Sequence, residues 1–139
     1  MSAFADRGDD KAVRAMPILF QAHFVEPIRR GEKTVTRRRW QGARMKPGQV
    51  YEAKSPRFGR PFARLRVVSV MWEREPGAAL DSYLAGLPMV NRAGVLNKEA
   101  ERAGFRSWQE FLRAWSRMHG PQAMEGPCWR IEFAIEEVC

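Results

Sequence analysis

Cysteine is scarce in this chain: only Cys128 and Cys139 occur among its 139 residues, and both lie near the C-terminal end. Two cysteines in these positions are too few for the disulfide framework of a small secreted protein. Together with His23 and His119 they also match none of the usual ligand spacings of a zinc site. We therefore expect no structural metal, no cofactor and a reducing, cytoplasmic location.

Long hydrophobic runs are also missing. No stretch approaches the roughly 18 apolar residues that a membrane-spanning helix needs, and residues 1–15 carry acidic side chains and lack the apolar centre of a signal peptide. The segment GARMKPG (42–48) does not end in the Lys-Ser/Thr pair of a P-loop. The length suits one domain. We expect a flexible arm over residues 1–15 and a single domain over 16–139, with no membrane partner.

Acidic residues are rare in one region of the chain. The whole chain has 24 Lys and Arg against 16 Asp and Glu, a net charge of +8. Residues 29–66 contain 13 of the basic side chains but only Glu32 and Glu52 as acids. Such an excess suits a polyanion such as nucleic acid, because neutralised phosphates release condensed counterions. The alternative is that solvated arginines serve solubility alone, since arginine outnumbers lysine 19 to 5.

Apolar runs, alternating patterns and β-branched residues predict five strands, over residues 17–24, 34–40, 50–54, 62–72 and 128–137. In the last of these strands Trp129, Ile131, Phe133 and Ile135 lie on one side, because successive side chains point to opposite faces. We expect both Trp72 and Trp129 in the hydrophobic core.

Helix signals fall before and between these strands. A short helix is predicted from Pro27 to a stop at Gly31, and another around residues 80–84. Further helices are predicted from Asn97 to Gly104 and from the N-cap Ser107 onward, where SWQE forms a capping box. Strands on both sides of a helical insert, with the final strand returning to the sheet, predict an α+β fold.

The stretch RRGEKTVTRRRW (29–40) carries the candidate chemistry. Like charges and burial would lower the pKa of Lys33, so that it can act as a general base. Thr36 offers a hydroxyl that is either a nucleophile or a ligand of a substrate oxygen. In a regular strand these two residues face opposite ways, so they converge only if Lys33 lies in the turn before the strand. The alternative is a solvated turn lysine and a threonine that merely forms strand.

Basic and aromatic residues beside this pair are the candidate substrate ligands. The forked donors of Arg37 and Arg38 suit a phosphate, a carbonyl or a base edge, and Arg38 is favoured because it shares a strand face with Thr36. Trp40 and Tyr51 border the basic segment and can stack on a nucleobase, with barrel core as the alternative. If the segment is only an exposed edge, its arginines instead deter aggregation.

The segments ILFQAHFVEPIRRGEKTVTRRRW and KPGQVYEA resemble the ASCH (activating signal cointegrator homology) domain family, whose hallmark is a short helix, G-x-K-T-x-T-x-R and a following strand. The resemblance covers residues 17–54, and the later segment NKEAERAGFRSWQEFLRAW with the last strand is similar to the family's second half. It implies a PUA-like β-barrel with helices around one cleft, and RNA or a modified nucleoside as partner.

The resemblance also implies chemistry. Some members remove the acetyl group of acetylcytidine with the motif's lysine and threonine, here Lys33 and Thr36, and a glutamate from the helical insert. Others are ribonucleases that cleave single-stranded RNA. Relatives read E-G-F where this chain has Ala103 before Gly104, so Glu101 is the candidate acid/base partner and Glu99 its alternative. Without such a carboxylate the domain is expected to be a non-catalytic RNA-binding module.

Overall fold

The computed structural model describes residues 16–56 and 59–139, so the predicted arm over 1–15 lies outside the described residues. In the described part, five strands form one sheet: β1 (Ile18–Leu19), β2 (Val35–Arg38), β3 (Val50–Lys54), β4 (Pro61–Glu73) and β5 (Cys128–Val138). The helices there are α2 (Val25–Arg29), α3 (Asp81–Ala85), α4 (Met89–Arg102) and α5 (Trp108–His119), with 3-10 turns η1 (Ala22–Phe24), η2 (Ala78–Leu80) and η3 (Pro121–Glu125). The α+β class predicted from the sequence is confirmed.

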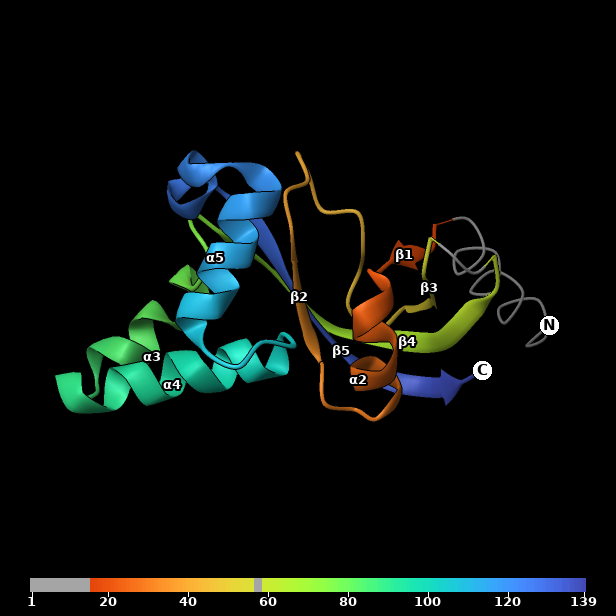
Figure 1. Cartoon of the computed structure of the whole chain (residues 1–139), viewed down its shortest axis with the longest axis horizontal. Coiled ribbons are helices and arrows are strands. Elements are labelled where there is room, and N and C mark those ends of the chain that lie inside the picture. Colours follow the sequence, from red (N-terminus) through yellow and green to blue (C-terminus); the bar gives the residue numbers. More distant parts are fainter. Residues whose placement is uncertain (1–15, 57–58) are drawn as a thin grey trace.

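The sheet curls into a half-barrel whose strand order is β1-β3-β4-β5-β2 (Figure 1). β1 runs parallel to β3, and the other three pairs are antiparallel. β1 and β2 are the two edges of the sheet, and a side-chain hydrogen bond from Arg38 Nη2 to the Leu19 carbonyl oxygen (2.6 Å) joins them. β2 passes between α5 and α2 in the view of Figure 1. The strand part of RRGEKTVTRRRW therefore lies where the sheet meets the helices.

β4 changes faces part-way along its length. Val67 pairs with Phe133 and Ser69 with Glu132, so Val68 is an extra residue in the β4 ladder. Before this bulge Ala63, Leu65 and Val67, at alternate positions, lie in the core of the half-barrel, and after it Val70 packs against that core. The prediction that Trp72 is a core residue was wrong: its side chain is 57% exposed. It lies near the end of β4, opposite the half-buried Trp129.

Two hydrophobic cores lie on opposite faces of the sheet. The larger core fills the half-barrel with residues such as Phe20, Ile28, Leu65, Ile131 and Phe133. The smaller core packs α4, α5 and η3 against the other face through Ala100, Phe111, Trp115, Ala123 and Cys128. The helical insert thus covers the face that Glu73 and Cys128 occupy, which explains why those two polar groups are buried.

The sequence predicted correctly those helix ends that depend only on neighbouring residues. Ser107 caps α5, since its Oγ accepts from the Glu110 backbone N–H at 3.1 Å. Gly31 and Gly104 both adopt positive φ, as helix stops commonly do. Asn97 was wrongly predicted as a helix start: α4 already begins at Met89, and the Asn97 side chain instead accepts from the Trp108 backbone N–H.

Two N-terminal boundaries also differ from prediction. The strand predicted over 17–24 spans only Ile18–Leu19, because the chain turns into η1 at Ala22. α2 begins at Val25 rather than Pro27, and proline is tolerated there because the first turn of a helix does not use its N–H groups. None of the helices in the described part of the chain is long and apolar enough to cross a membrane.

Candidate active site

A groove runs between the η1–α2 segment and the α4–α5 side of the molecule, and three adjoining pockets form it. The lysine pocket, of about 880 Å³, is lined by Pro27, Glu32, Lys33, Lys98, Glu101, Arg102, Gly104, Phe105, Arg106 and Glu110. The junction pocket, of about 440 Å³, is lined by Gln21, His23, Phe24, Gly104, Phe105, Glu110, Ala114, Arg117 and Met118. The threonine pocket, of about 280 Å³, is lined by Leu19, Phe20, Gln21, Phe24, Thr36, Arg37, Arg38, Arg39, Pro56, Met118 and His119.

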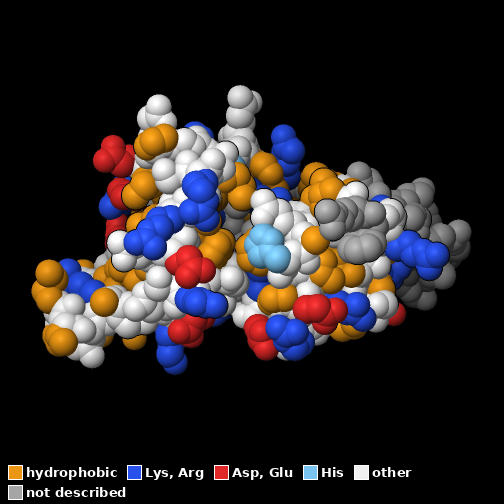
Figure 2. Space-filling model, viewed as in Figure 1, with side chains coloured by type: hydrophobic (Ala, Val, Ile, Leu, Met, Phe, Trp, Pro, Cys, Tyr) orange, Lys and Arg blue, Asp and Glu red, His pale blue; other side chains and the backbone are white. Residues whose placement is uncertain are grey.

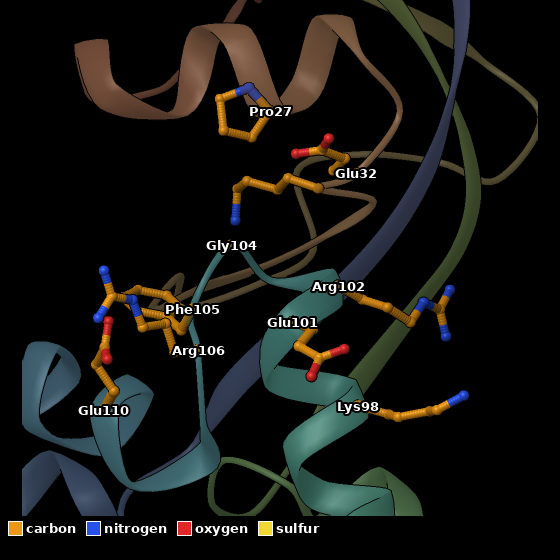
Figure 3. Close-up of a pocket in the computed structure, with 10 residues that line it drawn as sticks. Pro27, Glu32, Lys98, Glu101, Arg102, Gly104, Phe105, Arg106 and Glu110 are labelled. Atoms are coloured by element: carbon orange, nitrogen blue, oxygen red, sulfur yellow. The ribbon is translucent and has the colours of Figure 1, made fainter.

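The pockets share walls, which makes the groove continuous. Phe105 and Glu110 belong to both the lysine and junction pockets, and Phe24 and Met118 to both the junction and threonine pockets. Figure 3 shows the lysine pocket, with Pro27 and Glu32 facing α4 and the loop that follows it. Basic side chains lie on both halves of the face seen in Figure 2, with hydrophobic side chains between them.

Lys33 lies in the turn before β2, which is the position in which its side chain and that of Thr36 can face the same way. Its backbone N–H bonds to the Pro27 carbonyl at 3.1 Å, and the strand starts only at Val35. The side chain is nevertheless buried, and its amine donates to the carbonyl oxygens of Val35 (2.8 Å) and Ala103 (2.5 Å). The amine also lies 4.3 Å from the centre of the Phe24 ring. The alternative of a solvated turn lysine is therefore wrong.

The surroundings of Lys33 favour its uncharged form. Burial, followed by the charges of Arg38 and Arg37, lowers its pKa well below the ordinary value of a lysine. A neutral amine has two N–H groups and one lone pair. The two carbonyl acceptors use both N–H groups, so the lone pair is free to take a proton. The lowered pKa thus favours a neutral amine at one end of the groove, which is the form that a general base requires.

Thr36 and Arg38 line the threonine pocket on the inner face of β2. The Arg38 guanidinium lies 5.1 Å from the Phe20 ring centre, and burial lowers the pKa of Arg38 to about 10. Neither of the two hydrogen bonds of the Lys33 amine goes to Thr36. The predicted lysine and threonine therefore line the two end pockets of the groove, with the junction pocket between them, and are not in direct contact. Phe24 lies against the Lys33 amine and also lines the threonine pocket.

Arg37 points to the opposite face of β2 and is fully buried. Its guanidinium pairs with Glu73 (2.6 Å) and Glu99 (2.8 Å), and Glu99 in turn pairs with Arg130 (2.6 Å). Nη1 of Arg37 has no hydrogen-bond partner among the described residues, but the guanidinium carbon lies 5.5 Å from the centre of the Trp108 ring. The sequence-based proposal of Arg37 as a substrate ligand is therefore corrected: its side chain holds the helical insert on the sheet.

The two candidate carboxylates have different positions. Glu99 is buried in the pairs just described; burial alone would raise its pKa, but hydrogen bonds from Arg130 and the charge of Arg37 outweigh burial and keep the pKa below its ordinary value. It is therefore a fixed anion and no proton donor. Glu101 is exposed and, like Lys33, lines the lysine pocket. Figure 3 shows Glu101 on α4. Of the two, only Glu101 is placed to serve as a proton-transfer partner.

The predicted stacking residues do not line the groove. Tyr51 is 5% exposed, and its hydroxyl accepts from the Lys46 backbone N–H at 3.0 Å. Trp40 is half-buried against the larger core, with Arg44 5.9 Å from its ring centre. Tyr51 has no ring face open to a base, so the barrel-core alternative describes it better, whereas Trp40 keeps part of its surface exposed.

Comparison with solved structures identifies the fold. Protein EF3133 of Enterococcus faecalis, described as a DUF984 protein, is 14% identical over 99% of this chain and 93% of its own, with a TM-score of 0.55. The hypothetical protein PH0355 is 15% identical over 86% and 96%, also with a TM-score of 0.55. A mutant ZmASCH protein from Zymomonas mobilis is 11% identical over 84% and 66%, with a TM-score of 0.50. The chain has an ASCH-like fold.

No protein-family model matches the sequence, and no curated protein does either. The likeness is therefore one of fold, and it agrees with the curled half-barrel and surrounding helices of this chain. At identities below 16% it assigns no activity. The roles of Lys33, Thr36, Arg38 and Glu101 remain predictions that depend on the geometry of the groove.

The ASCH-like fold also brings together residues that the sequence did not single out for the site. Glu110 was identified only as the last residue of the capping box SWQE, yet it lines both the lysine and junction pockets. Arg39 and His119 line the threonine pocket. The only local signal for them was position: Arg39 ends the basic run, and His119 ends α5. Cys128 takes no part in the groove, and burial, with Glu73 beside it, raises the pKa of its thiol to about 12.

Proposed function

We propose that this ASCH-type domain binds RNA or a modified nucleoside in the groove and hydrolyses an acetylcytidine-type amide. The observation that carries the proposal is the buried Lys33 amine, which is held by two carbonyls and depressed in pKa beside open pockets. Amines with these properties are found as general bases in catalytic sites, where burial and neighbouring charges tune the pKa toward neutrality.

In this mechanism Lys33 takes a proton from a water molecule in the groove. The water oxygen attacks the acetyl carbonyl carbon, the C–N bond breaks, and the proton passes to the amine nitrogen that leaves on cytidine. Acetate and cytidine are the products. Because Thr36 is not hydrogen-bonded to Lys33, its hydroxyl suits the role of ligand to the substrate carbonyl oxygen better than that of nucleophile. Glu101 is the carboxylate that takes this proton from the Lys33 ammonium and passes it to the leaving nitrogen, and the second proton of the water is released to solvent as acetate forms.

A non-catalytic RNA-binding module is the second candidate. The observation in its favour is that the amine of Lys33 is bonded to a backbone carbonyl, that of Ala103, at the position where relatives read glutamate. A groove without a buried carboxylate beside the lysine still offers positive charge and apolar walls to an RNA strand. Binding would then occur without product.

The test is mass spectrometry of acetylcytidine, and of an RNA oligonucleotide containing one acetylcytidine, after incubation in EDTA. Wild type is compared with Lys33→Ala, and with Lys98→Ala as the matched control, because Lys98 lines the same pocket but is exposed. The hydrolase predicts deacetylation by wild type and Lys98→Ala but not by Lys33→Ala, with circular dichroism showing that every variant is folded.

Other outcomes decide between the alternatives. Cleavage of the RNA backbone that depends on Lys33 would replace the amidohydrolase with a metal-independent ribonuclease. Salt-dependent binding of RNA that is recovered unchanged would support the non-catalytic RNA-binding module. Equal deacetylation by wild type and Lys33→Ala would remove Lys33 from the chemistry.

A further inference from the structure

The threonine pocket has a distinctive charge pattern. Arg37, Arg38, Arg39 and His119 line it together with apolar side chains such as Phe20 and Met118, and none of the described residues that line it is an aspartate or glutamate. Arg38 gives one hydrogen bond to a neutral carbonyl, that of Leu19. Within residues 16–56 and 59–139, neither Arg38 nor Arg39 forms an ion pair with a carboxylate.

The neighbouring arginine shows what a structural role looks like in this protein. Arg37 precedes this pair in β2 and is neutralised by Glu73 and Glu99, as expected for a buried arginine that only supports the fold. Arg38 is half-buried, and no carboxylate among the described residues pairs with it. An uncompensated guanidinium in such a place costs free energy unless a ligand provides the negative charge.

His119 lies within the field of the same two arginines. It is the last residue of α5, and its ring packs on Trp115 with 4.3 Å between ring centres. Burial, then the charges of Arg39 and Arg38, lower its pKa below the ordinary value for histidine. The groups around His119 from β2 are therefore cationic, and Arg117 on its own helix adds a further positive charge at the junction pocket.

We propose that Arg38, Arg39 and His119 form a phosphate subsite in the threonine pocket, so that the groove takes a nucleotide or an RNA strand in preference to a free nucleoside. This inference rests on the proposed function, because it names the substrate class of the same groove. Forked guanidinium donors bind phosphate oxygens bidentately, and the apolar walls suit the attached sugar and base. The pocket volume, about 280 Å³, holds a single nucleotide unit and no duplex.

The experiment compares three probes by isothermal titration calorimetry: acetylcytidine, its 5′-monophosphate, and a short RNA containing it as a phosphodiester. Wild type is measured beside Arg39→Gln and His119→Gln. Arg113→Gln is the control, because Arg113 is an exposed residue of α5 outside the lining of the groove and loses the same charge. Arg39 is itself exposed, so its replacement leaves the fold intact.

We expect wild type and Arg113→Gln to bind the monophosphate at least about tenfold more tightly than the nucleoside, as a charge-assisted contact predicts. In Arg39→Gln this preference should fall to about twofold or less. A preference for the RNA over the monophosphate identifies the diester as the natural ligand, and the reverse identifies a free nucleotide. Equal affinity of wild type for nucleoside and monophosphate would overturn the subsite, as would an equal loss of preference in Arg113→Gln.

Acetyl release measured on the same samples separates this inference from the proposed function. Hydrolysis of nucleoside and monophosphate with the same kcat/KM would keep the hydrolase and reject the phosphate subsite. Preferential binding of the monophosphate without acetate release would keep the subsite and reject the hydrolase.

Discussion

Lys33 and Ala103 stand 70 positions apart in the chain, and the amine of the first donates to the carbonyl oxygen of the second at 2.5 Å. The contact crosses the base of the groove, from the turn before β2 to the end of α4. The titratable amine of Lys33 is thus bonded to a backbone carbonyl oxygen, which does not itself titrate. The protonation of this lysine is therefore linked both to folding and to any chemistry in the groove.

The folding link predicts how stability depends on pH. Lys33 has a lower pKa in the folded than in the unfolded protein, so the unfolded chain binds more protons between those two values. The free energy of unfolding should therefore rise with pH from the lowered folded pKa up to about 10.5, the pKa of an unperturbed lysine. We expect urea titrations from pH 6 to 10 to show this rise in wild type relative to Lys33→Met. Parallel curves for the two proteins would mean that the amine stays charged when buried.

The chemical link predicts the pH dependence of catalysis. Only the neutral amine accepts a proton, so kcat/KM for acetylcytidine should increase with pH as Lys33 deprotonates and then reach a plateau. Because the pKa is lowered, the plateau should be reached well below pH 10. A rate that continues to climb toward pH 10.5 would point to an ordinary, solvent-exposed lysine as the base.

Arg37 is expected to be a residue of stability and not of binding. Replacing it with methionine leaves Glu73 and part of Glu99 without their buried cation, a change that typically costs about 3–5 kcal/mol. The exposed Arg113→Met should change the free energy of unfolding by no more than about 0.5 kcal/mol. Urea denaturation of both variants checks the difference. A stable Arg37→Met protein that had lost RNA affinity would reinstate Arg37 as a ligand.

Two glycines should respond to alanine in opposite directions. Gly104 has φ +95°, and a Cβ there would lie 2.7 Å from a ring atom of Phe24, so Gly104→Ala should cost about 1–3 kcal/mol. Gly94 lies inside α4, and a Cβ there would meet no neighbouring atom within 4 Å, so Gly94→Ala should add about 0.5–1 kcal/mol. Thermal unfolding of the two variants measures both. Tolerance of Gly104→Ala would show that Phe24 can move out of the groove wall.

The salt dependence of RNA binding measures how many RNA phosphates the protein contacts. Each neutralised phosphate of a single strand contributes about 0.7 to the slope of log Kobs against log salt concentration. Arg39→Gln should lower the slope by about that amount, and Arg113→Gln should leave it unchanged. Fluorescence anisotropy from 50 to 300 mM salt measures both slopes. Identical slopes for Arg39→Gln and wild type would place RNA elsewhere on the protein.

The elements that the sequence predicted correctly depend on neighbouring residues. The bounds of β3, the Ser107 cap and the turn position of Lys33 follow from β-branched runs, a capping box and a glycine stop within a few positions. Each of these signals acts within about one turn of chain. They predicted the fold class and the position of Lys33 in the turn before β2.

What the sequence left unpredicted depends on distant partners. Arg37 looks identical to Arg38 and Arg39 in a basic run, and only Glu73 and Glu99, far along the chain, distinguish it. Likewise, no local pattern brings His119 to β2, since that contact requires α5 to pack across the sheet. The formal charge of the segment therefore overstates the charge that a ligand meets.

The extra residue in β4 bears on how such proteins are compared. The backbone of β4 is one continuous strand from Pro61 to Glu73. The alternation of its side chains between the two faces of the sheet, however, reverses at Val68. An alignment without gaps to a relative that lacks the bulge would match inward residues with outward ones from there on. The buried Glu73 would then be paired with a position that faces the barrel interior, and its link to Arg37 would be invisible. A gap of one residue at Val68 is the alignment that keeps the ion pairs in register.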